Sequence, residues 1–226
     1  MSASHGALKH HFEDIEQQRG VERLGMWMFL TTEILFFGGA FLAYTVYRLQ
    51  YSADFAHASS LLNVLIAGIN TVLLITSSLT MTLAIRNAQL GERSKLIRNL
   101  LITAILGTAF MCFKAYEYYI DWEEHLIPWS DKFSQAHLPE GANPEKIKLF
   151  FCFYYGLTAI HGIHLIIGIG CVLYLVGRVY NGTMTPSYYA HVEVVSLYWH
   201  LVDAIWLFLM PLLYLAGPHS LKGLHF

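Results

Sequence analysis

Five long apolar stretches are the feature that most limits how this sequence can fold. They cover about residues 25–47, 61–85, 100–120, 149–176 and 194–215. A helix needs about 20 mainly apolar residues to cross a bilayer, and each stretch meets that requirement. Only 13% of the residues are charged, whereas soluble domains carry about 25%. The sequence therefore predicts an all-α polytopic membrane protein, a bundle of five transmembrane helices.

The segments outside these stretches predict how the chain is oriented. Residues 1–24 are strongly charged and lack the apolar core of a signal peptide, so we expect a cytoplasmic N-terminal tail. We expect residues 25–216 to form the membrane domain and residues 217–226 to form a tail on the outside. Cytoplasmic segments are usually richer in lysine and arginine. Here eight such residues lie in segments predicted inside and five in segments predicted outside, so the predicted topology is N-inside and C-outside.

Composition excludes several classes of protein. The 14 Lys and Arg residues against 16 Asp and Glu residues give a net charge of −2, without the basic excess of a nucleic-acid-binding protein. The three cysteines, Cys112, Cys152 and Cys171, lie in apolar runs without CxxC spacing, which disfavours disulfides and a zinc site. The sequence also lacks a phosphate-binding loop, a zinc-protease motif and a nucleophile elbow. We therefore predict no catalytic residue and no metal ligand in this chain.

Glu33 is the first ionisable residue inside an apolar stretch. Such residues need an explanation, because a charge at the bilayer centre costs at least ~2.5 kcal/mol. Burial favours the protonated form of a carboxyl group. Two interpretations stay open: Glu33 is a neutral structural acid that bonds to another helix, or it holds and relays a proton.

Other ionisable residues occur at helical spacing. His161 and His164 are three residues apart, which places both imidazoles on one helix face, as hydrogen-bonded core residues or as metal or haem ligands. Lys114 and Glu117 have the same spacing, so we expect them to pair with each other, with the lysine able to reach the outer interface. A third set lies on one stripe of the last helix, where a histidine between two acids would offset part of their charge. Its members are Glu193, His200 and Asp203.

At these same residues the sequence resembles subunit III of the haem–copper cytochrome oxidases. Residues 31–37 resemble the family's Ser-Glu-x-x-Phe-Phe segment, residues 60–63 its Pro-Leu-Leu-Asn segment and residues 115–119 its Ser-Glu-Tyr-Tyr segment. Residues 161–168 resemble its His-Gly-x-His-x-x-x-Gly pattern, and residues 193–206 its Glu-x-x-x-x-Tyr-Trp-His-Phe-Val-Asp-x-x-Trp pattern. The chain has five predicted spans and lacks the first two spans of the mitochondrial form. It is therefore similar to the bacterial form, which implies the bacterial cytoplasmic (inner) membrane.

The resemblance implies an accessory subunit that binds phospholipids and has no redox cofactor of its own. In the family, subunit I carries the haems and copper, and subunit II carries the entry copper site or its quinol-oxidase counterpart. Subunit III packs on subunit I, stabilises it and supports proton uptake. The implied complex is a proton-pumping oxidase that passes electrons from cytochrome c to oxygen. The alternative is the equivalent subunit of a quinol oxidase or nitric oxide reductase.

The resemblance also implies roles for individual residues. Glu33 matches the family's buried glutamate, which reacts with carbodiimide. Arg178 matches an arginine that binds a lipid phosphate, and we place His161 and His164 in the same lipid-binding set. The remaining matched residues are expected to form a structural polar core: Glu193, His200, Asp203, Lys114 and Glu117.

The resemblance also implies which subunits the chain contacts. Subunit I is the main expected contact, subunit II a further one, and the long outer loop at about residues 121–148 is expected to meet other respiratory-complex subunits. Two other functions stay open from the residues alone. One is a membrane cytochrome b with haem ligands among His161, His164 and His200, and the other is a proton-coupled carrier that uses Glu33.

Overall fold

The computed structural model describes residues 15–130, 133, 143–182 and 190–217. In this part of the chain there are six helices: α1 (Ile15–Gln50), α2 (Ser52–Leu61), α3 (Val64–Gln89), α4 (Arg93–Glu123), α5 (Pro144–Tyr180) and α6 (Ala190–Tyr214). All of these except α2 are long and apolar enough to cross a membrane. The prediction of an all-α, five-helix membrane bundle is therefore confirmed, and the orientation of the bundle stays a prediction.

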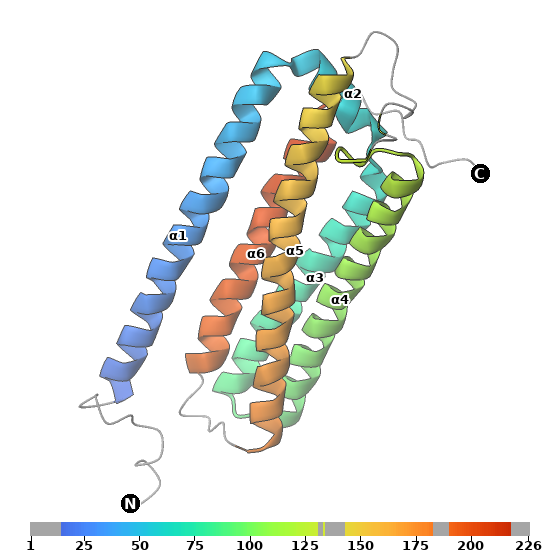
Figure 1. Ribbon diagram of the computed structural model, residues 1–226. Helices are drawn as coiled ribbons and strands as arrows, with labels where there is room; N and C mark the ends of the chain where they lie inside the picture. The colour runs from blue at the N-terminus through green and yellow to red at the C-terminus, as the bar shows by residue number, and fades with distance from the viewer. Residues whose placement is uncertain (1–14, 131–132, 134–142, 183–189, 218–226) are drawn as a thin grey trace, which may run out of the picture.

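Four helices form the body of the molecule (Figure 1). α3 packs against α4 and α6, and α5 packs against the same two helices, so the four close into a bundle. α1 lies beside this bundle and packs mainly on α6, with which it runs parallel, and α2 lies at the end where α1 finishes. After five crossings, the beginning of α1 and the end of α6 lie at opposite ends of the molecule.

Some helix boundaries differ from the predicted stretches because capping, and not hydropathy, sets them. The second predicted span starts at residue 61, but α3 starts at Val64. The side chain of Asn63 accepts hydrogen bonds from the N–H groups of Leu65 and Ile66, and asparagine is among the strongest N-cap residues. The residues just before this cap form α2, a separate helix that the hydropathy pattern did not indicate.

Three predicted segments fall partly outside the described residues. They are the N-terminal tail at 1–24, the C-terminal tail at 217–226 and the outer loop at about 121–148. The structure describes residues 15–24 as the beginning of α1, and α4 continues to Glu123, which takes in the first three residues of the predicted loop. The division of the chain into tails and membrane domain stays a prediction.

Trp199 of α6 joins the four helices of the bundle. Its side chain is fully buried, and its indole Nε1 donates to the Ser77 hydroxyl of α3 at 3.1 Å. A Cβ atom on Gly107 of α4 would lie 2.8 Å from this ring, and one on Gly168 of α5 would lie 3.2 Å from it. Helices in membranes pack closely where small residues let them approach, and here two glycines make room for one tryptophan.

α1 is the least covered of the five spanning helices. Only 11% of its most apolar 18-residue window is buried, against 50% for α6. Large apolar side chains such as Leu35 and Leu42 are exposed along it. In a bilayer such a face contacts lipid or another membrane helix, because lipid tails are as apolar as leucine.

Candidate functional site

Glu33 of α1 and His164 of α5 form a contact between the peripheral helix and the bundle. The His164 Nε2 atom lies 3.1 Å from a carboxyl oxygen of Glu33, and its Nδ1 atom lies 2.8 Å from the backbone carbonyl oxygen of Ile160. Each of the two side chains is 18% exposed. The pair therefore lies near the surface of the bundle, within the depth of the membrane.

The hydrogen bonds of this pair fix how many protons it holds. The carbonyl oxygen of Ile160 can only accept, so Nδ1 of His164 carries a hydrogen. One further proton must then lie between Nε2 and Glu33, either on the carboxyl group of a neutral pair or on the ring of an ion pair. The arrangement can hold one proton and can move it between two side chains on different helices.

Lys114 lies at the centre of a second cluster, which joins α4, α5 and α6. Its Nζ atom donates to Glu117 at 2.9 Å, to the Tyr154 hydroxyl at 3.1 Å and to the Tyr214 hydroxyl at 2.9 Å. The Tyr214 hydroxyl donates in turn to the second carboxyl oxygen of Glu117 at 2.7 Å. The predicted pairing of Lys114 with Glu117 is confirmed.

The expectation that Lys114 reaches the outer interface is wrong. Only 7% of its side chain is exposed, because all three of its N–H donors have partners inside the bundle. Asp121 extends the same cluster and was not predicted: it is buried and accepts a hydrogen bond from the Tyr155 hydroxyl at 3.2 Å. It lies four residues after Glu117, on the same helix face, but the sequence placed it in the loop.

Two of the three polar residues of α6 have partners on other helices. Glu193 pairs with Arg23 of α1 at 3.3 Å, and Nδ1 of His200 lies 2.7 Å from the Ser78 hydroxyl of α3. Asp203 is buried near Ser78, yet neither of its carboxyl oxygens makes a hydrogen bond within the described part of the chain. His200 thus contacts a hydroxyl group. The expectation that His200 offsets part of the negative charge of Glu193 and Asp203 is therefore not supported by a direct contact.

The residues placed in the lipid-binding set lie at different depths. Arg178 is in the last turn of α5, where its Nη1 atom donates to the exposed Tyr174 hydroxyl at 3.1 Å. His164 bonds to Glu33, as described above. His161 is only 1% exposed and contacts the rings of Phe110 and Trp206.

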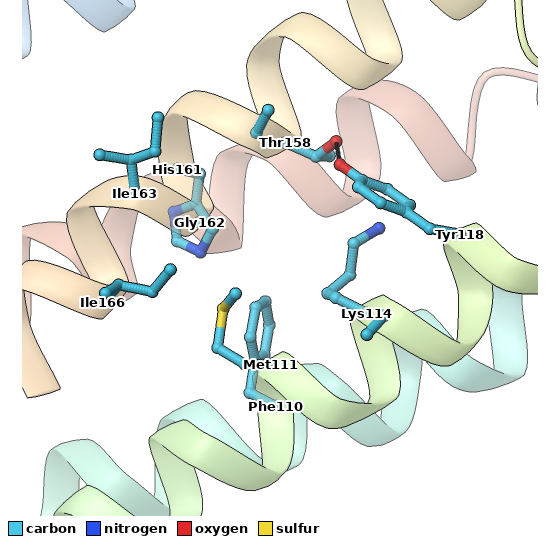
Figure 2. Close-up of a pocket in the computed structure, with 11 residues that line it drawn as sticks. Phe110, Met111, Lys114, Tyr118, Thr158, His161, Gly162, Ile163 and Ile166 are labelled. Carbon is cyan, nitrogen blue, oxygen red and sulfur yellow. Dashed lines mark hydrogen bonds between the residues drawn. The ribbon is translucent and has the colours of Figure 1, made fainter.

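A pocket of about 190 Å³ lies between α4 and α5, with Lys114, His161, Tyr118 and Met111 arranged around it (Figure 2). The Tyr118 hydroxyl donates to Thr158 at 2.6 Å, and Thr158 donates to the backbone carbonyl of Tyr154. Most of the other lining residues are apolar. Sequence reasoning identified His161 and Lys114 separately and did not place them at one pocket.

Within the described ranges, no three His, Cys, Asp or Glu side chains lie close enough together to hold a metal ion. Both ring nitrogens of His164 are already in contact with Ile160 and Glu33. A haem on that imidazole would have to displace one of these contacts.

Comparison with known proteins decides the family. A model of the family described as cytochrome c oxidase subunit III matches residues 4–123 and 148–218, which include four of the spanning helices in full and α5 from residue 148 onwards. The chain belongs to the cytochrome c oxidase subunit III family. The resemblance seen in the sequence is thereby confirmed, and the chain is a multi-pass membrane protein that associates with the other subunits of an oxidase complex.

Individual members of the subunit III family match most of the chain. The cytochrome c oxidase subunit 3 of Synechocystis sp. is 32% identical over 199 residues, covering 84% of this chain and 74% of the relative. A probable cytochrome c oxidase subunit 3 of Nocardia farcinica is 29% identical, covering 84% and 86%. A probable quinol oxidase subunit 3 of Staphylococcus haemolyticus is 28% identical, covering 87% and 90%. Relatives with similar identity to this chain are thus named after two different electron donors, cytochrome c and quinol.

Proposed function

We propose that this chain is a subunit without a redox centre in a proton-pumping haem–copper oxidase of a bacterial cytoplasmic membrane. It stabilises subunit I, binds phospholipid and supports proton uptake, while haem and copper reside in partner subunits. Subunit I is its main contact, subunit II a further one, and the outer loop meets other respiratory-complex subunits. Cytochrome c is the proposed electron donor.

The contact between Glu33 and His164 is the observation that carries the proposed role in proton uptake. It holds one shared proton at membrane depth, on a peripheral helix that is little covered. The same contact ties α1 to α5, so it also supports the proposed structural role. A carrier that worked alone would use the same proton, but family membership assigns the chain to an oxidase complex.

Glu33 is expected to react with an apolar carbodiimide in preference to the acids of the exposed helix ends. Carbodiimides add to protonated carboxyl groups, and a neutral pair with His164 places the proton on Glu33. Mass spectrometry of the labelled complex should find the modification on Glu33, and Glu33→Gln should abolish it. Labelling mainly at Glu123 and Glu124 would contradict a protonated Glu33.

Arg178→Ala is expected to remove phospholipid from the purified complex and to shorten its catalytic lifetime. A charge-assisted hydrogen bond is worth about 1.5–3 kcal/mol, so lipid binding at this position should weaken roughly 10- to 100-fold. Quantitative lipid analysis and the decay of oxygen consumption during turnover measure the two effects. Arg178→Lys keeps the charge but loses the planar fork of the guanidinium group. Its lipid content and catalytic lifetime should lie between those of the unmodified complex and Arg178→Ala. Unchanged lipid content in Arg178→Ala would contradict the lipid role.

A quinol oxidase is the second candidate, because relatives from both classes match equally well. Oxygen consumption by the purified complex separates the two. Turnover with reduced cytochrome c but not with a short-chain quinol supports the proposed donor, and the reverse result supports the second candidate.

A further inference from the structure

The pocket between α4 and α5 opens sideways, towards the membrane. Ile163 and Ile166 line it and are each more than half exposed, and Ala115 and Ala159 are exposed lining residues as well. His161 and Phe110 form its buried part. Figure 2 shows side chains of both helices arranged around the same space. A molecule dissolved in the bilayer would reach His161 without passing through water.

His161 is the polar group of this pocket that needs a partner. It is 1% exposed, and neither of its ring nitrogens makes a hydrogen bond with any described residue. The other polar lining groups are occupied: Lys114 donates all three of its N–H bonds, and Tyr118 and Thr158 bond to each other. A buried polar group without a partner costs about 1–3 kcal/mol.

Water is a poor partner for His161. A buried water makes about three hydrogen bonds to protein groups, and the donors of the other polar lining groups are already used. An acyl chain would fill the space but would leave the imidazole without a hydrogen bond. The occupant that satisfies both needs has an apolar body and one oxygen that can hydrogen-bond.

The depth of the pocket excludes a phospholipid headgroup or ester. His161 lies near the middle of the apolar stretch 149–176, and Phe110 lies at the middle of the stretch 100–120. The hydrocarbon core is about 30 Å thick, so lipid ester groups lie about 15 Å from its centre. A ligand whose oxygen reaches His161 must itself partition into the middle of the bilayer.

We propose that this pocket binds the ring of a membrane-soluble quinone or quinol, with a ring oxygen hydrogen-bonded to His161. A cavity of about 150 Å³ accommodates a benzene ring, and this pocket measures about 190 Å³. Phe110, Tyr118 and Met111 supply aromatic and thioether walls, and the apolar tail leaves between Ile163 and Ile166. No electron transfer is part of this proposal, which concerns binding alone.

Photolabelling of the intact complex tests the site. The complex is placed in lipid nanodiscs, illuminated with a photoreactive azidoquinone that has a ten-carbon tail, and digested for mass spectrometry. The expected label lies on the pocket residues of α4 and α5, and excess unlabelled quinone removes it. His161→Phe keeps an aromatic ring, slightly larger than the imidazole, but loses the hydrogen bond, so labelling should fall at least about 3-fold.

Variants that fill the pocket provide the matched comparison. A Cβ atom on Gly162 would lie 3.7 Å from the Met111 methyl group, whereas one on Gly170 would have no atom within 4 Å. Gly162→Leu should therefore reduce labelling at least tenfold, and Gly170→Leu should leave it unchanged. Ala115→Leu fills the pocket from the other helix and should act like Gly162→Leu. Equal labelling in all variants, absence of label from this pocket, or labelling by a phospholipid with a photoreactive tail but not by the quinone would overturn the proposal.

Discussion

Lys114→Met is expected to lower the free energy of unfolding by about 3–5 kcal/mol, because it leaves a buried carboxylate without its cation. Glu117 is 2% exposed, so water cannot replace the lost partner. The Tyr154 hydroxyl loses the same donor. Titration of the detergent-solubilised protein with sodium dodecyl sulfate, followed by circular dichroism, measures the change.

The pair of Glu92 and Lys95 is the matched control, because it has the same spacing at the beginning of the same helix. The Lys95 side chain is 55% exposed, and an exposed ion pair contributes about 0–1 kcal/mol, so Lys95→Met should have little effect. Replacing both Lys114 and Glu117 by apolar residues should recover much of the loss. Equal effects of Lys114→Met and Lys95→Met would show that the buried cluster does not hold the helices together.

Trp199→Ala is expected to destabilise the bundle by about 2–4 kcal/mol. Deleting a buried tryptophan costs about 3–5 kcal/mol in the core of a soluble protein. Part of that cost is the free energy of transferring the side chain out of water, and this part is smaller for a helix in lipid. The cavity remains, since Gly107 and Gly168 have no side chains to fill it. The Ser77 hydroxyl also loses the indole donor.

Trp122→Ala provides the comparison for Trp199, because Trp122 is 67% exposed. Its removal should change the unfolding free energy by less than about 1 kcal/mol, measured in the same detergent titration. If both substitutions have the same effect, close packing around Trp199 is not what joins the four helices.

The five spanning helices were predictable because length and hydropathy are local properties of the sequence. α2 and the beginning of α3 were not, since a single side chain, that of Asn63, sets the boundary between them. The loop was predicted to start at Asp121 because that residue is charged. In the structure the helix continues past Asp121, and the carboxyl group of Asp121 lies against a cluster of tyrosines.

The functional side chains were easier to find than their partners. Lys114 and Glu117 are three residues apart, so helical spacing alone predicts their contact. Glu33 and His164 are 131 positions apart, and nothing local in the sequence joins them. The sequence predicted that Glu193, His200 and Asp203 share one stripe of α6, but their partners depend on the neighbouring helices: Glu193 contacts α1 and His200 contacts α3.

Visible spectroscopy shows whether this chain carries a redox centre of its own. It is applied to the complex isolated through this chain in mild detergent, and to the chain purified alone. We expect haem and copper in the complex and neither in the isolated chain. Haem retained by the isolated chain would contradict this expectation, and would make the membrane histidines ligands.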